Sequence, residues 1–208
     1  MKIETMVVGK LATNCYIISR DGEACLVDPG DEAARILRYI EDNNFSLKYI
    51  FLTHGHFDHI LAADEVREKT GAKLVIGEPD AGMLSDTRSF AIFTVGKKLK
   101  AMTADILVRD RDSFSACGGE FVYMHTPGHT PGSSVILFGD VIFSGDTLFE
   151  GDCGRCDLPG GDYAAMLKSL GKLYELEGDY KVYPGHDVAT TLDRERESNA
   201  DMRRAVGK

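Results

Sequence analysis

Short runs of apolar and β-branched residues, separated by turn residues, dominate the start of the chain. The runs span residues 3–8, 14–19 and 24–28. Gly9-Lys10 and Asp21-Gly22 interrupt them as turn signals, so the pattern predicts three strands. Residues 31–43 instead repeat apolar side chains at helical spacing, which predicts a helix after the third strand.

The remaining pattern alternates in the same way. Further strands are predicted over residues 48–54, 73–76, 106–108, 120–125, 133–139, 141–146 and 180–186, and further helices over 59–70, 162–177 and 190–204. Residues 80–105 show helical hints without a clear period, and a flap that faces the substrate is one hypothesis for them. Two β-rich halves, each with helices, are typical of a layered α/β protein.

Composition adds a size and a charge to this picture. With 208 residues and 43% hydrophobic content, the chain can bury a sizeable core, which predicts one domain over residues 1–208. The 24 basic and 33 acidic residues give a net charge of −9. A nucleic-acid-binding protein usually shows a basic excess or stripe, so we expect no nucleic-acid partner. The basic segment "GKKLK" at 96–100 is short and isolated, and is read as solvated.

The chain carries none of the usual signals for export or membrane insertion. The first 30 residues contain no long apolar region with a small-residue cleavage site. No window reaches the roughly 18 apolar residues of a membrane span. The five cysteines are odd in number and scattered, which argues against a disulfide framework. We therefore expect a cytoplasmic protein with no membrane partner.

The segment "THGHFDH", residues 53–59, crowds three of the six histidines around one aspartate. Imidazoles repel one another when they are partly charged, so this crowding calls for a compensating cation. Three further candidates follow predicted strands, in "HTPGHTPGSS", "FSGDTLF" and "VYPGHD". The candidate ligands are His54, His56, Asp58, His59, His129, Asp146 and His186. His125 is read as a structural histidine.

Five imidazoles and two carboxylates form a nitrogen and oxygen donor set that suits zinc, iron or manganese and needs no thiolate. Seven ligands are too many for one tetrahedral ion. They suit two divalent ions about 3.5–4 Å apart that share a carboxylate. Zinc is the preferred cofactor, and iron or manganese is compatible with the same donors.

These segments resemble known metal-binding motifs. "THGHFDH", "HTPGHT", "SGDTLF" and "YPGH" resemble, in order, the motifs of metallo-β-lactamase-fold hydrolases. Within these, "LVDPG", "CGRCDLPGGD" and "ERESN" are similar to the glyoxalase II-like (hydroxyacylglutathione hydrolase-like) group of short single-domain proteins. The resemblance implies an α/β (α+β) fold, a four-layer αββα sandwich with the site at the edge where two sheets meet.

The resemblance also implies roles for individual residues. His54, His56 and His129 would hold one ion, and Asp58, His59 and His186 the other. Asp146 would bridge the two ions, and Asp58 would also orient the attacking hydroxide and pass its proton. Arg155 matches a basic substrate contact of the group. Its guanidinium can instead pair with Asp157 to brace the loop.

The activity implied is a metal-dependent hydrolase that cleaves a small-molecule thioester, such as an S-acylglutathione or a related thiol ester, with a bridging hydroxide as the nucleophile. The main alternative is a persulfide dioxygenase with a single iron held by His54, His129 and Asp146. Another ester or lactone hydrolase of the same fold is a weaker alternative, as is an exported β-lactamase. A non-catalytic metal-binding module ranks last, because all seven ligands are present.

Three smaller features stay open at this stage. Cys153 and Cys156 form a C-x-x-C pair in a glycine-rich loop, where a redox or metal role is a minor alternative. Asp28 is either a brace for the site or a plain turn residue. Asp157 stands where glyoxalase II enzymes carry an aromatic residue, and Asp187-Val188 stands where they carry Glu-Tyr. The resemblance therefore indicates thioester hydrolysis more directly than glutathione recognition.

Overall fold

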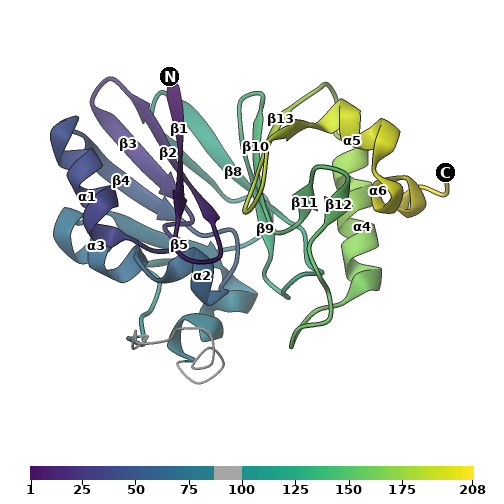
Figure 1. Ribbon diagram of the computed structural model, residues 1–208, viewed down its shortest axis with the longest axis horizontal. Coiled ribbons are helices and arrows are strands. Elements are labelled where there is room, and N and C mark those ends of the chain that lie inside the picture. Colours follow the sequence, from purple (N-terminus) through teal and green to yellow (C-terminus); the bar gives the residue numbers. More distant parts are fainter. Residues whose placement is uncertain (87–99) are drawn as a thin grey trace.

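The computed structural model of the protein describes residues 1–86 and 100–208, and in this part of the chain two six-stranded sheets lie face to face between outer helices (Figure 1). The first sheet has the order β1-β2-β3-β4-β5-β6, and the second has the order β14-β13-β10-β9-β8-β7. In Figure 1, α1 and α3 cover one outer side, and α4, α5 and α6 cover the other. The four-layer αββα arrangement is thereby confirmed.

The first sheet takes its strands from the amino-terminal half. They are β1 (Lys2–Val8), β2 (Thr13–Arg20), β3 (Glu23–Val27), β4 (Ser46–Phe51), β5 (Lys73–Gly77) and β6 (Ile106–Val108). The pairs β1/β2 and β2/β3 are antiparallel, whereas β3, β4, β5 and β6 run parallel. The parallel connections contain α1 (Ala33–Asp42), α2 (Phe57–Ile60), α3 (Ala63–Thr70) and the 3-10 helix η1 (Glu78–Ser85).

The second sheet belongs to the carboxy-terminal half. Its strands are β7 (Ser113–Ala116), β8 (Gly119–His125), β9 (Ser134–Phe138), β10 (Val141–Gly145), β13 (Lys181–Pro184) and β14 (Thr190–Thr191). All neighbouring pairs are antiparallel except β10/β13. A small ribbon of β11 (Leu148–Phe149) and β12 (Asp152–Cys153) precedes α4 (Tyr163–Tyr174), and α5 (Leu192–Ser198) and α6 (Ala200–Ala205) follow the last strand.

Apolar side chains on both faces of each sheet explain the layering. Ile17 packs into the core under α1 and α3, whereas Ile18 packs into the core between the sheets. On β10, Ile142 packs under α4 and Phe143 packs between the sheets. Strands that are buried on both faces read as continuous apolar runs, which is why the sequence pattern found most of them.

The differences from the predicted elements are local. The helix predicted over 59–70 is two helices, α2 and α3, and α2 already begins at Phe57. The helix predicted over 190–204 is also two helices, because Asn199 has extended backbone angles and accepts hydrogen bonds from two backbone N–H groups of α6. The strand predicted over 48–54 ends at Phe51, and four short strands (β7, β11, β12 and β14) were not predicted.

The segment predicted to be irregular, 80–105, begins in η1. Its residues 87–99 lie outside the described residues, as does most of the basic segment 96–100. The substrate-facing flap therefore stays a prediction. Across the described residues, no helix combines the length and the apolar character needed to span a membrane.

Candidate metal centre

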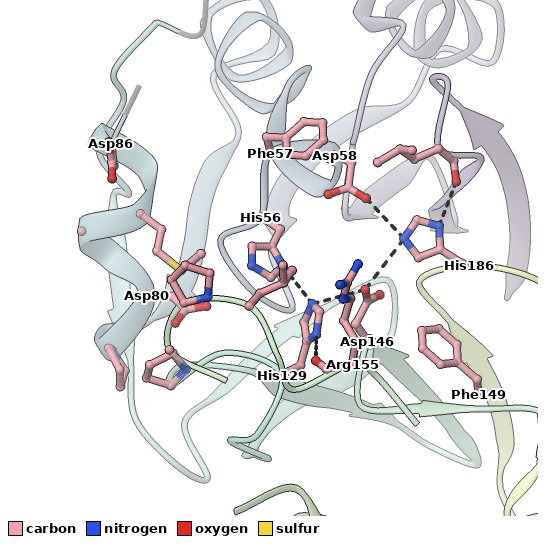
Figure 2. A pocket seen from close by; sticks show the side chains of 18 of the residues that line it. His56, Phe57, Asp58, Asp80, Asp86, His129, Asp146, Phe149, Arg155 and His186 are labelled. Carbon is pink, nitrogen blue, oxygen red and sulfur yellow. Dashed lines mark hydrogen bonds and ion pairs between the residues drawn. The ribbon is translucent and has the colours of Figure 1, made fainter. Parts of the chain in front are cut away.

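The candidate ligands follow the ends of strands from both sheets. Residues 53–59 come directly after β4 and Leu52, and His129 lies in the turn between β8 and β9. Asp146 directly follows β10, and one residue separates His186 from the end of β13. Because these strand ends meet at the same edge of the sandwich, ligands from distant parts of the sequence come together there. Figure 2 shows His56, Asp58, His129, Asp146 and His186 directed toward one another at the cavity.

The structure brings six of the seven candidate ligands into two adjoining groups of three. The donor atoms of His54, His56 and His129, the first cluster, lie within 4.8 Å of one another. The donor atoms of Asp58, His59 and His186, the second cluster, do so as well. These are the two groups that the sequence resemblance implies.

Asp146 lies between the two clusters. Its Oδ2 atom is 3.4 Å from His129 Nε2 in the first cluster, and its Oδ1 atom is 3.4 Å from His59 Nε2 in the second. Oδ1 is buried and has no hydrogen-bond partner among the described residues. A carboxylate in this position can offer one oxygen ligand to each cluster.

Hydrogen bonds on the far side of each ring decide which nitrogen faces the centre. His129 Nδ1 is 2.7 Å from the Arg155 carbonyl oxygen, and His186 Nδ1 is 3.1 Å from the Leu11 carbonyl oxygen. A carbonyl accepts only, so both rings carry a proton on Nδ1, and Nε2 is the nitrogen that faces the centre.

His54 and His59 are oriented through one buried carboxylate, that of Asp28. Asp28 accepts hydrogen bonds from the Thr53 backbone N–H and the Thr53 hydroxyl, at 2.8 and 2.6 Å. The hydroxyl in turn accepts from His54 Nδ1 at 3.1 Å, and Asp28 also accepts from His59 Nδ1 at 3.0 Å. Asp28 is therefore a brace that sets two rings.

Ring nitrogens of different histidines face one another across the centre. His56 Nδ1 lies 2.8 Å from His129 Nε2, and His59 Nε2 lies 3.3 Å from His186 Nε2. His54 Nε2 is buried without a partner among the described residues. Unpartnered buried donor and acceptor atoms are costly, and a metal ion satisfies such a set of nitrogen and oxygen atoms. The residues present therefore fit a divalent metal centre.

The electrostatics of the first cluster keep its imidazoles neutral. Burial, followed by repulsion from His59, lowers the pKa of His54 well below 6.5. Burial, followed by repulsion from His129, lowers the pKa of His56 to about 3. Neutral imidazoles are the form that binds metal.

The second cluster has the opposite balance. Burial alone lowers the pKa of His59, but the negative charges of Asp146, Asp58 and Asp28 outweigh it and raise that pKa to about 10. Burial raises the pKa of Asp58, but attraction to His59 and a hydrogen bond with His186 lower it below its usual value. The three carboxylates therefore stabilise a positive charge beside them. Without metal this charge is the extra proton on His59, and with metal it would be the ion.

Two glycines allow the chain to approach the ligands closely. A Cβ atom on Gly185 would lie 2.3 Å from Asp146 Oδ1 and 2.7 Å from His59 Cε1. A Cβ on Gly154 would lie 1.8 Å from the Asp146 carbonyl oxygen and 3.3 Å from His129 Nδ1. Each position is closed to any side chain, which explains the glycine beside a ligand in "YPGH" and in the loop after β12.

Asp80 is a site residue that the sequence analysis missed. Its buried carboxylate accepts hydrogen bonds from the Gly55 N–H at 3.0 Å, the Thr130 hydroxyl at 2.7 Å and the Gly132 N–H at 2.6 Å. Gly55 lies between His54 and His56, and Thr130 follows His129. Asp80 therefore ties together the two loops of the first cluster. Only its position in "GEPD", one residue after a proline that follows a buried strand, hinted at a role.

The other residues singled out from the sequence lie around or outside the centre. Arg155 lines the cavity, but its guanidinium makes two hydrogen bonds with Asp157, at 2.7 and 2.8 Å. This pair is the loop brace that the sequence offered as the alternative, so substrate binding by Arg155 stays a prediction. Cys153 and Cys156 are free cysteines that do not line the cavity, and His125 belongs to neither cluster.

Comparison with known proteins shows similarity over nearly the whole chain. The family model described as the metallo-beta-lactamase superfamily matches residues 8–186. Hydroxyacylglutathione hydrolase GloC of Haemophilus influenzae is 33% identical, over 96% of this chain and 97% of that protein. The crystal structure of the BLEG-1 B3 metallo-beta-lactamase is 32% identical with a TM-score of 0.90, over 97% of this chain and 99% of that one. TTHA1623 in a di-iron-bound form is 30% identical with a TM-score of 0.83, over 95% and 98%.

Proposed function

Because this chain belongs to the metallo-beta-lactamase superfamily, whose fold implies a divalent metal centre, we propose that it is a hydrolase that uses two metal ions to cleave a thioester. The observation that carries the proposal is the pair of ligand clusters on either side of one shared carboxylate, Asp146, at the wall of a cavity. The similarity to GloC supports a thioester as the bond that is cleaved.

Each cluster would hold one ion. His54, His56 and His129 would bind the first, Asp58, His59 and His186 would bind the second, and Asp146 would contact both. These ligands donate only nitrogen and oxygen atoms, a set that favours zinc and is also compatible with iron or manganese. Two ions held in this way would supply a bound water of lowered pKa and would polarise the acyl carbonyl.

The chain's own residues orient the reactants and handle the proton. Asp58 is ionised and lines the cavity, with Oδ2 at 3.3 Å from His186 Nε2 and 3.5 Å from the Thr13 hydroxyl. It is placed to accept the proton of a water that attacks the acyl carbon. The new C–O bond replaces the C–S bond, and the products are a carboxylic acid and a thiol, which takes up one proton.

The test is hydrolysis of a panel of thioesters that includes S-lactoylglutathione, with the zinc-loaded protein and a His56→Ala control. We expect turnover of at least one thioester that stops when a chelator removes zinc and returns when zinc is restored. His56→Ala is expected to lose about a hundredfold or more of that rate, because the first ion loses a ligand. A fully loaded protein that cleaves no thioester would overturn the proposal.

Two other reactions belong in the same experiment. The similarity to a B3 metallo-beta-lactamase makes a β-lactam the second candidate substrate. The persulfide dioxygenase alternative would need one iron at His54, His129 and Asp146, so oxygen consumption with a persulfide and the iron-loaded protein tests it. Thioester turnover without either of these activities favours the proposed function.

Asp80 provides a separate prediction about the first cluster. Asp80→Asn is expected to weaken metal binding there by about tenfold to a hundredfold, because the amide NH₂ would face an N–H or O–H donor and loosen the two loops. It is also expected to lower the unfolding free energy of the metal-free protein by about 1–3 kcal/mol. Chelator competition and denaturant titration measure the two effects, with the exposed Asp140→Asn as control. Reduced stability with unchanged metal affinity would restrict Asp80 to a purely structural role.

A further inference from the structure

The cavity beside the metal centre is larger than two ions and a water require. Its volume is about 880 Å³, and His56, Asp58, His129, Asp146 and His186 form part of its wall. Cavities of roughly 300–1,000 Å³ are the size that binds small organic ligands. The remaining wall should therefore reflect the chemistry of the substrate.

Most of the remaining wall is apolar and comes from separate segments. The apolar lining residues are Leu11, Phe57, Pro79, Met83, Pro131, Phe149, Leu158 and Pro159. Phe57, Met83, Phe149 and Leu158 are half-buried, and Leu11 is 50% exposed. Apolar side chains left open to water around a reactive centre mark a surface that a ligand covers.

These apolar groups flank the ligands on more than one side. The Phe149 ring centroid lies 6.4 Å from that of His186, next to the second cluster (Figure 2). Met83 packs against Gly55, which separates two ligands of the first cluster, since a Cβ on Gly55 would lie 2.7 Å from Met83 Cβ. A substrate bound at the centre therefore meets apolar surface beside both clusters.

Outside the two ligand clusters, the charged groups of the wall offer little to an anionic substrate. Among the lining residues in the described part of the chain, Arg155 is the one arginine or lysine, and two of its guanidinium nitrogens donate hydrogen bonds to Asp157. Asp187 adds an exposed carboxylate to the same lining. A glutathione thioester carries two carboxylates and one ammonium group, so it would bring net negative charge to this wall.

On the basis of the proposed function, we propose that the substrate class is an uncharged thioester with an apolar acyl chain longer than acetyl. The chain lies on the apolar wall, and the carbonyl carbon reaches the water beside Asp58. Water adds its oxygen to this carbon, the C–S bond breaks, and the fatty acid and the protonated thiol leave. The reaction needs no oxidant or further co-reactant.

The test compares acyl chains on one neutral thiol with the zinc-loaded protein. The substrates are the acetyl, butanoyl, hexanoyl and octanoyl thioesters of N-acetylcysteamine, with S-lactoylglutathione as the anionic comparison. We expect kcat/KM to rise by about tenfold or more from acetyl to hexanoyl, because each fully buried methylene can contribute up to about fourfold. We also expect S-lactoylglutathione to be a poorer substrate than the hexanoyl ester.

A matched pair of variants locates the effect in the cavity. Leu158→Gln places a polar group of similar size on the wall, and is expected to lower the hexanoyl-to-acetyl ratio of kcat/KM by about fivefold. Leu107→Gln changes an exposed leucine on β6 that does not line the cavity, and should leave the ratio unchanged.

The outcomes separate this inference from the proposed function. A rate that does not depend on chain length, or S-lactoylglutathione as the best substrate, would overturn the apolar substrate class and leave thioester hydrolysis standing. An equal change of the ratio in both variants would also count against the apolar wall. No cleavage of any thioester by the loaded protein would overturn the proposed function itself.

Discussion

Replacing Asp146 with asparagine is expected to lower kcat/KM for thioester hydrolysis by about a thousandfold, which corresponds to roughly 4 kcal/mol of lost transition-state stabilisation. The two carboxylate oxygens of Asp146 each lie 3.4 Å from an imidazole nitrogen, one in each cluster. Asparagine keeps the size of the side chain but removes the negative charge. Its amide nitrogen also carries no lone pair that can bind metal.

Metal content tests the physical reason for this loss. We expect Asp146→Asn to bind less than two ions per chain, because both ions lose a shared anionic ligand. Atomic emission spectrometry after gel filtration measures the number of metal ions per chain, and kcat/KM is measured on the same sample. Asp140→Asn, in the exposed turn between β9 and β10, removes the same charge away from the centre and should change neither quantity. An Asp146→Asn protein with two ions and more than a tenth of the original kcat/KM would contradict the bridging role.

Replacing Asp58 with alanine is expected to remove one ion and to lower kcat/KM by about a hundredfold to a thousandfold. Asp58 Oδ2 lies 3.3 Å from His186 Nε2 and 3.7 Å from His59 Nε2, so it contributes only to the second cluster. Its loss leaves His54, His56 and His129 able to hold the first ion. The loss also removes the group that accepts the proton, a contribution of about 10²–10⁴ in rate for general bases.

The comparison of two variants distinguishes the roles of the two clusters. Asp58→Ala and His56→Ala should each retain about one ion per chain, since each removes a ligand from a different cluster. Titration with a chromogenic chelator should therefore release about one ion per chain from each variant and about two from the unsubstituted protein. If Asp58→Ala kept both ions and full activity, Asp58 would be neither a ligand nor the base.

Most regular elements were predictable because their residue patterns are local. Strands such as β3 and β10 are buried on both faces, so they appear in the sequence as nearly continuous apolar runs. The short strands β11 and β14 have two residues each, and their hydrogen-bond partners define them rather than any pattern. The break between α5 and α6 depends on capping by Asn199, which the helical spacing on either side conceals.

The chemistry of the centre was also present in the sequence, since histidine and aspartate at strand ends are recognisable metal-ligand types. The sequence did not show which of these ligands lie next to one another. His56 and His129 are 73 positions apart and lie with ring nitrogens 2.8 Å from each other only because β4 and β8 end at the same edge of the sandwich. The resemblance to a family implied this grouping, and the geometry of the fold produces it.

The sequence by itself therefore determined the ligand types and most strands and helices, because each depends on residue identity and short-range spacing, and the resemblance of its motifs to a known family implied the class of chemistry. Only the tertiary structure decided which nitrogen of His129 and His186 faces the centre, the bracing by Asp28 and Asp80, and the apolar wall of the cavity. The three hydrogen bonds that Asp80 accepts come from residues 25, 50 and 52 positions away. Contacts across such separations depend on how the sheets pack, and no local pattern records them.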